Sequence, residues 1–112
     1  MKLLIFEWNW ADEFDVHGFI IINESDYDGF VKCVGAFEDE LTISFGTNEE
    51  FDFGSGAEIV ESFTVKDITD EQAAQLVNVF GLRLHTFTND KYKGKYYEFG
   101  WTPFVQALDM TL

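Results

Sequence analysis

The sequence predicts an α+β domain: a mostly antiparallel sheet of five to seven strands, two main helices and a short C-terminal helix. Three observations lead to this class. Segments in which apolar and polar side chains alternate, as in half-buried strands, recur along the chain. Two other segments carry apolar residues at helical spacing directly after a capping residue. At 112 residues the chain has the size of one domain, so residues 1–112 are expected to form a single acidic globular domain.

The first two predicted strands cover residues 2–10 and 18–22. In the first, Leu4 and Phe6 fall on one side of the chain and alternate with residues on the other side, which is the period of a strand. Residues 11–16 are predicted to form the loop that joins the two strands.

Two interpretations fit the stretch that follows. Asp26, Asp28 and Gly29 stand where an EF-hand calcium loop places two carboxylates and its turning glycine. The twelfth position of such a loop needs a glutamate that binds calcium through both oxygens, but this position holds Gly35. Calcium would lose its largest single ligand, which disfavours a calcium site.

A helix over residues 26–37 is the favoured interpretation of the same stretch. Ser25 is a natural N-cap, and Asp26 and Asp28 in the first turn would face the positive end of the helix dipole. The apolar stripe of this helix would consist of Tyr27, Phe30, Val31, Val34 and Phe37.

Three more strands are predicted before the next helix. Residues 41–45 alternate, residues 51–53 form a short strand after a polar connection, and residues 54–56 form a glycine-rich break. Residues 58–66 are rich in β-branched and aromatic side chains, and are predicted to be one long strand.

The clearest local signal is a helix over residues 70–80. Thr69 and Gln72 have the spacing of a capping box, and Gly81 is placed to end the helix in the left-handed conformation. The predicted buried stripe consists of Ala73, Leu76, Val77 and Phe80.

The chain closes with two predicted strands, residues 82–87 and 95–101, and a short helix over residues 103–109. Thr102 is the expected N-cap of that helix and Pro103 its first residue. A strand-helix-strand unit with a hydroxyl-bearing cap thus occurs twice in the chain. Two such units predict a ferredoxin-like βαββαβ core within the α+β class.

Charge is the outlying feature of the composition. The chain has 21 acidic and 7 basic residues, and its net charge is −14. Residues 1–82 hold 18 acids and three lysines, a net −15, whereas residues 83–112 hold three acids and four bases, a net +1. Direct binding to nucleic acid or to an anionic membrane is disfavoured, because both require a cationic face.

The expected setting is cytoplasmic. The single cysteine, Cys33, cannot form an internal disulfide, so nothing argues for an oxidising compartment. The apolar run at the N-terminus breaks at Glu7 and has no small-residue cleavage site. No stretch approaches the roughly 18 apolar residues of a membrane span.

No catalytic residue, metal site or cofactor is predicted. Nucleophilic catalysis needs a Ser, Cys or Thr beside a base, and the two histidines of the chain are His17 and His85. Cys33 sits within a predicted helix and is interpreted as a packing residue. One metal hypothesis stays open, in which Asp12, Asp15 and His17 bind Mg²⁺ or Mn²⁺, although a solvated turn is the favoured interpretation of these residues.

Acidic and aromatic residues are interleaved in a way that predicts a protein-binding surface. Aromatic side chains beside charges are typical of protein–protein hot spots, and an acidic surface speeds association with a basic partner. Three acidic clusters are predicted to carry this surface: Asp12, Glu13 and Asp15; Glu38, Asp39 and Glu40; Glu49, Glu50 and Asp52. The predicted aromatic anchors are Trp10, Phe14 and Tyr27.

In size, charge and lack of a catalytic motif, the chain is similar to phage DNA mimics of the anti-CRISPR and anti-restriction type. The resemblance implies a non-enzymatic inhibitor of a basic partner, a nuclease or another nucleic-acid-binding protein, because carboxylates can occupy sites that phosphates fill. Three alternatives stay open: an immunity protein that neutralises a nuclease toxin, a small metal-dependent enzyme or metal sensor, and an acidic structural protein. The sequence does not indicate an oligomeric state.

Overall fold

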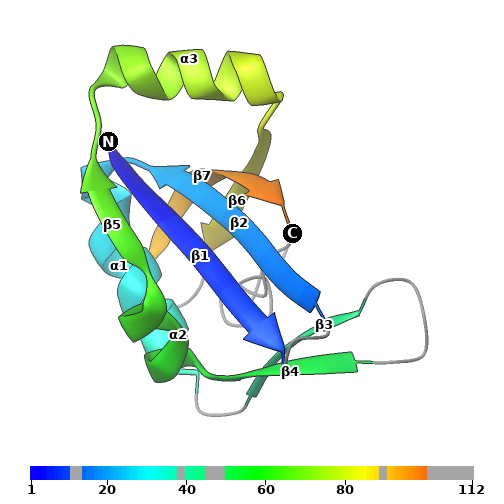
Figure 1. Ribbon diagram of the computed structural model, residues 1–112. Coiled ribbons are helices and arrows are strands. Elements are labelled where there is room, and N and C mark those ends of the chain that lie inside the picture. The colour runs from blue at the N-terminus through cyan, green and yellow to red at the C-terminus, as the bar shows by residue number, and fades with distance from the viewer. Residues whose placement is uncertain (11–13, 38–39, 45–49, 89–90, 101–112) are drawn as a thin grey trace.

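The computed structural model describes the backbone of residues 1–10, 14–37, 40–44, 50–88 and 91–100, and the side chains of residues 1–7, 17–37, 55–88 and 91–99 (Figure 1). These residues form seven strands and three helices. In chain order the elements are β1 (Lys2–Trp10), β2 (Phe14–Ile22), α1 (Glu24–Gly35), β3 (Glu40–Ser44), β4 (Glu50–Ser55), α2 (Gly56–Ser62), β5 (Thr64–Asp67), α3 (Asp70–Phe80), β6 (Arg83–Thr88) and β7 (Lys93–Gly100).

Five of the strands form one sheet in the order β5-β1-β2-β7-β6, and every neighbouring pair is antiparallel. β3 and β4 form a separate two-stranded ribbon. Helices α1 and α2 cover one face of the five-stranded sheet, and α3 crosses the other face at one end (Figure 1). β5 and β6 are the two edge strands, and α3 is the connection between them.

The main core lies between the sheet and the pair α1 and α2. Phe30 of α1 stands in its middle, with its ring centroid 5.4 Å from that of Tyr96 and 6.3 Å from that of Phe87. Burying one large apolar side chain stabilises a fold by roughly 1.5–3 kcal/mol, so this face is the largest source of stability. Its buried residues are Leu4, Phe6, Ile20, Ile22, Phe30, Cys33, Val34, Ile59, Phe87 and Tyr96.

A smaller core lies under α3. Ile21, Ala73 and Leu82 are buried there. The sequence analysis places Phe80 in the buried stripe of this helix, but its side chain is 46% exposed. The reason is that α3 covers only one end of the sheet, so Phe80 in its last turn lies against the ring of Phe99 and not beneath the helix.

The predicted α+β class with a mostly antiparallel sheet is confirmed. The helix over residues 70–80 is confirmed together with its caps: the Gln72 N–H donates to Thr69 Oγ1 at 3.1 Å, and the Thr69 N–H donates to Gln72 Oε1 at 2.9 Å. Gly81 ends the helix with φ +60°, a conformation that glycine adopts at no steric cost.

The prediction of one long strand over residues 58–66 is wrong. Residues 56–62 form α2, and only residues 64–67 form a strand, β5. Ser55 caps the helix by accepting from the Glu58 N–H at 3.4 Å, and Ile59 is fully buried in the main core. The sequence pattern Ser-x-x-Glu is typical of a capping box at the start of a helix. The prediction of a strand followed instead from the β-branched composition of the segment.

The predicted strand-helix-strand order occurs twice, as β2–α1–β3 and β5–α3–β6, and the ferredoxin-like core stays a prediction. The strand of the second unit is shorter than predicted, because residues 58–66 are not one strand. In the structure a helix fills most of that segment, and α1 leads into the separate β3–β4 ribbon and not back into the main sheet.

Other element boundaries differ by a few residues from those predicted. The predicted loop over residues 11–16 is too long, because β2 already begins at Phe14, opposite Trp10. The first helix covers Glu24–Gly35 and not residues 26–37. Its N-cap is Asn23 and not Ser25, since the Asn23 carbonyl accepts from the N–H groups three and four residues onward, at Asp26 and Tyr27. The predicted closing helix over residues 103–109 lies outside the described residues.

The junction between α1 and α2 allows a direct test of the main core. A Cβ added at Gly56 would lie 1.7 Å from the Val34 carbonyl oxygen, so Gly56→Ala must push the two helices apart. We expect it to lower the free energy of unfolding by more than about 3 kcal/mol. Gly35→Ala is the control, because its added Cβ would meet only Val60 at 4.0 Å. Urea denaturation measures both, and equal stability of the two variants would contradict this packing.

Candidate functional site

Most predicted partner-binding residues lie on segments for which no side chain is described. Five fall outside the described residues altogether: Asp12, Glu13, Glu38, Asp39 and Glu49. Six more have a described backbone only: Trp10, Phe14, Asp15, Glu40, Glu50 and Asp52. The three clusters therefore stay predictions.

The backbone nevertheless places the strands that carry these clusters. Asp15 lies opposite Asn9 near the turn of the β1–β2 hairpin, and Asp52 lies opposite Thr42 in the β3–β4 ribbon. The turn end of the hairpin and the whole ribbon lie at the lower end of the molecule in Figure 1, away from α3. Segments distant in sequence are thus directed toward the same end of the fold.

Tyr27, the third predicted anchor, has a described side chain. It is half-buried and packs against the main core. The Lys2 ammonium lies 5.8 Å from the centroid of its ring, a cation–π distance. Its contribution to partner binding stays a prediction.

The structure brings together a set of acidic residues that the sequence analysis did not group. They come from α2, β5 and the first turn of α3, and all are exposed. We call the set the acidic edge; it consists of Glu58, Glu61, Asp67, Asp70 and Glu71. Residues 58–71 contain one basic residue, Lys66, so this segment carries a net −4. It follows the outer side of β5, on the left in Figure 1.

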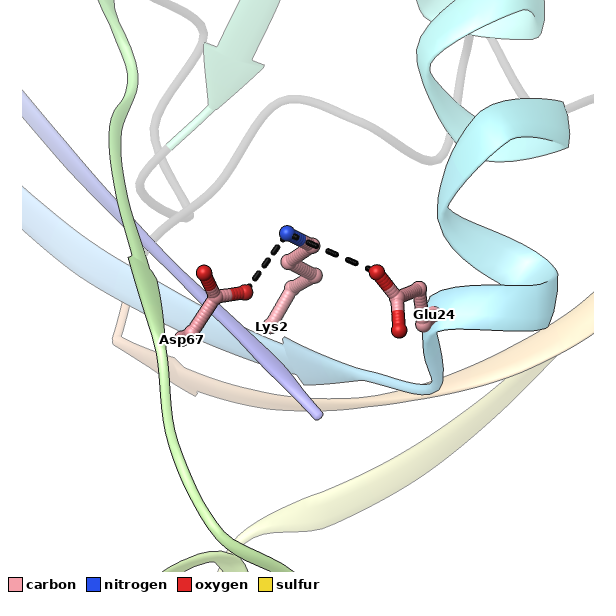
Figure 2. Close-up of polar contacts among 3 residues, drawn as sticks. All are labelled: Lys2, Glu24 and Asp67. Atoms are coloured by element: carbon pink, nitrogen blue, oxygen red, sulfur yellow. Dashed lines mark hydrogen bonds and ion pairs between the residues drawn. The ribbon is translucent and has the colours of Figure 1, made fainter.

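Lys2 forms ion pairs with two carboxylates on this side of the molecule, one of which, Asp67, belongs to the acidic edge. The Lys2 Nζ lies 2.6 Å from Asp67 Oδ1 and 3.8 Å from Glu24 Oε1, and its side chain is only 19% exposed. Figure 2 shows the ammonium between the two carboxylates, one from β5 and one from α1. The hydrogen bond with Asp67 raises the pKa of Lys2, and the same bond lowers the pKa of Asp67. The charge of Lys2 is thus satisfied inside the fold, although β1 lies next to the acidic edge.

The opposite edge of the sheet is basic. Arg83, Lys91, Lys93 and Lys95 are exposed on β6, β7 and the connection between them. We call these four residues the basic edge. Because the strand order is β5-β1-β2-β7-β6, the acidic edge and the basic edge lie on opposite sides of the sheet. The uneven charge of the sequence therefore becomes a partial separation of charge in space, since Asp26 of α1 also lies at the basic edge, where its Oδ2 accepts from the Lys95 N–H at 3.3 Å.

A buried polar cluster, which the sequence analysis did not identify, lies on β6 and β7. Glu98 is 5% exposed, with Oε1 3.2 Å from Arg83 Nη2 and Oε2 3.4 Å from His85 Nε2. The His85 ring is stacked on that of Tyr96 with centroids 5.3 Å apart. Burial and the nearby Glu98 raise the pKa of Tyr96 well above its usual value. The only sequence signal for the cluster is a glutamate between aromatic residues of a strand.

This cluster is incompletely satisfied. Tyr96 Oη, His85 Nε2 and Glu98 Oε2 are buried and make no hydrogen bond with the residues that the structure describes. Arg83 supplies the positive charge that compensates the carboxylate, so the arrangement holds a partly buried ion pair between two strands. We assign it to the stability of the basic edge.

The face that carries α3 has two further features. A pocket of about 550 Å³ lies beside α3, between Ala73, Val77 and Tyr97, with Asn23 and Asp70 also in its lining. Beyond the C-terminal turn of the helix, three phenylalanine rings are in contact. The centroid of Phe99 lies 5.1 Å from that of Phe19 and 5.1 Å from that of Phe80.

The metal hypothesis gains no support from the side chains that can be placed. His17 is exposed, and its Nδ1 lies 3.7 Å from Glu7 Oε1 on the neighbouring strand, while no side chain is described for Asp12 or Asp15. Among the residues with described side chains, no three His, Cys, Asp or Glu are grouped to hold a metal ion. Cys33 is buried in the main core. Of the helices described, none has the length and apolar character to cross a membrane.

Comparison with protein-family models, with curated proteins and with solved structures gives no match for this chain. The functional argument therefore depends on the charge and geometry of the molecule itself.

The Lys2–Asp67 pair gives a first prediction, on acid titration. Asp67 has a lowered pKa, so the stabilisation from this pair is present above the ordinary aspartate pKa of 3.8 and is lost as the pH falls through the lowered value. Lys2→Met should return the pKa of Asp67 to its ordinary range or above. Carboxyl-carbon NMR during a pH titration measures this value, and an unchanged Asp67 pKa in Lys2→Met would contradict the pairing.

The buried Tyr96 hydroxyl gives a second prediction. Because this hydroxyl is buried without a hydrogen bond, Tyr96→Phe removes an unsatisfied polar group. The variant should be as stable as the wild type or more stable by about 1 kcal/mol. Urea denaturation tests this, with the half-buried Tyr97→Phe as control. A loss above about 1 kcal/mol in Tyr96→Phe would mean that the hydroxyl has a partner.

Proposed function

We propose that this chain is a non-enzymatic acidic binding protein. Its partner is a basic protein that handles nucleic acid, and the chain inhibits that partner by occupying its nucleic-acid site. In this respect it would act as phage DNA mimics of the anti-CRISPR or anti-restriction type do. The observation that carries the proposal is the acidic edge, five exposed carboxylates on three adjoining elements with a single lysine among them.

The placement of the acidic edge on ordered helices and strands supports the proposal. Glu58 and Glu61 are on α2, Asp67 is on β5, and α2 is held by the fully buried Ile59. Carboxylates on ordered elements keep their spacing when a partner approaches, so little conformational entropy is lost on binding. A disordered acidic tail would have to be ordered first.

The internal neutralisation of lysines also supports the proposal. Lys2 is paired with Asp67 and Glu24, and Lys32 Nζ lies 2.9 Å from Asp28 Oδ2. Within the acidic edge Lys2 compensates Asp67, and the other four members, Glu58, Glu61, Asp70 and Glu71, are exposed to solvent. A negative surface of this kind raises the rate of association with a basic partner by roughly 10–10³-fold, and it excludes nucleic acid itself.

The three predicted clusters would extend this surface. Their flanking strands are directed toward the end of the molecule away from α3, whereas the acidic edge follows β5. A basic protein with an extended nucleic-acid groove could contact both. The phenylalanine group of Phe19, Phe80 and Phe99 offers a separate apolar contact on the face of the sheet that carries α3.

The proposal predicts that binding depends on salt and on the acidic edge. In affinity capture from the source cell, the retained protein should bind nucleic acid, should leave the complex when nucleic acid is added, and should be lost at high salt. Glu61→Lys with Glu71→Lys should slow association with this partner at least about 10-fold. Surface plasmon resonance measures the rates.

A matched control separates the acidic edge from total charge. Glu7→Lys with Asp28→Lys changes the net charge by the same amount at exposed positions outside the acidic edge. We expect less than about a 3-fold effect on association from this control. The proposal fails if the partner does not bind nucleic acid, or if reversal of neither the acidic edge nor any of the three predicted clusters changes the association rate.

A further inference from the structure

β5 is an open edge of the main sheet. It pairs with β1 through the register Leu4↔Val65 and Lys2↔Asp67, and in the described sheet no strand lies on its other side. The backbone N–H and C=O groups that point outward from an edge strand are a template for a further strand. Proteins usually protect such edges with prolines, bulges or inward-pointing charges.

β5 is protected by its short length of four residues and by the exposed Lys66, but by no other feature of the usual kind. All four of its side chains are exposed, including Val65 at 41%. Its pairing with β1 is regular, without a bulge, and residues 64–67 contain no proline. Lys66 is the only lysine on the strand, and it lies on the face opposite Val65 because side chains alternate.

Charge distinguishes β5 from the other open edge, β6. Members of the acidic edge lie at both ends of β5. Glu61 is on α2, which precedes β5 in the chain, and Asp70 is at the start of α3, which follows it. β6 instead lies in the basic edge, with Arg83 on it and Lys93 opposite its last residue. A basic extended segment would therefore be attracted to β5 and repelled from β6.

We propose that β5 accepts an extended, lysine- or arginine-rich segment of the partner as an additional strand of the sheet. Main-chain hydrogen bonds to the outward groups of β5 would supply affinity, as in other β-strand additions. Basic side chains on one face of the added strand would meet Asp67 and Glu61, which lie on the side of α1 and α2. This inference rests on the proposed function and specifies how the acidic edge is used.

The test uses two labelled nine-residue peptides of equal charge. One alternates lysine with valine and threonine (KTKVKTKVK), and the other has proline in place of threonine (KPKVKPKVK), which cannot donate to a strand ladder. Fluorescence anisotropy at low salt measures their dissociation constants for the full chain. We expect the first peptide to bind at least about 10-fold more tightly.

Hydrogen exchange locates the peptide and provides an internal control. Amides within residues 64–67 should exchange at least about 10-fold more slowly when the first peptide is bound, and amides of residues 83–88 on β6 should not change. Val65→Pro and Lys66→Pro are the two variants. Successive N–H groups of a strand point alternately toward β1 and away from it, so one of the two substitutions removes an N–H that points outward and leaves the pairing with β1 intact. The variant that keeps the wild-type circular dichroism should bind both peptides equally.

The outcomes separate this inference from the proposed function. Equal binding of the two peptides without protection of residues 64–67 overturns the strand addition and leaves the acidic binding surface intact. Protection of β6 in place of β5 overturns it as well. If neither peptide binds at low salt, the acidic binding surface itself is contradicted, and both proposals fall.

Discussion

Burial of one face of the five-stranded sheet against α1 and α2 is the interaction on which the rest of the molecule depends. A chain with a net charge of −14 repels itself when it becomes compact, and this apolar face opposes that repulsion. Its members come from β1, β2, β6, β7 and the two helices that cover this face. The interior strands of the sheet are β1, β2 and β7, and β5 and β6 lie at the edges.

The charge separation follows from that topology. The acidic segment 58–71 contains β5 and flanks it with α2 and the start of α3, while the lysines that follow residue 90 belong to the β6–β7 pair at the far side. α3 spans the distance between the two edges across the exposed face. Lys2 stands near the acidic edge, but its ammonium is held between Asp67 and Glu24 and ties β1 to β5 and α1. This cation compensates Asp67, and the acidic edge presents its other four carboxylates, Glu58, Glu61, Asp70 and Glu71, to solvent.

Local signals decided which parts of the fold could be predicted from the sequence. The helix at residues 70–80 was predictable because Thr69, Gln72 and Gly81 act within a few residues of chain. α2 was missed because the β-branched composition of its segment outweighed the capping pattern of Ser55 and Glu58, and a buried contact of Ile59 with α1 decides the conformation. Propensity is a weak preference that tertiary packing overrides.

The candidate site was harder to predict because it is a product of strand order. The imbalance of charge between the two parts of the chain was evident, but nothing local in residues 58–71 shows that they follow one edge of a sheet. The burial of Glu98 likewise depends on a pairing with Arg83 on another strand. The three predicted clusters rest on acids interleaved with aromatic residues along the chain, a local pattern that carries no information about spatial neighbours.

The separation of charge between the two edges can be measured directly, without any partner. Paramagnetic broadening of backbone amides by a cationic and by an anionic nitroxide of the same size reports the local electrostatic potential at each residue. The account predicts that the cationic probe broadens amides of residues 58–71 more than the anionic probe does, and that the preference reverses at residues 91–95. If the ratio of broadening by the cationic probe to broadening by the anionic probe is the same at residues 58–71 and at residues 91–95, the account is contradicted.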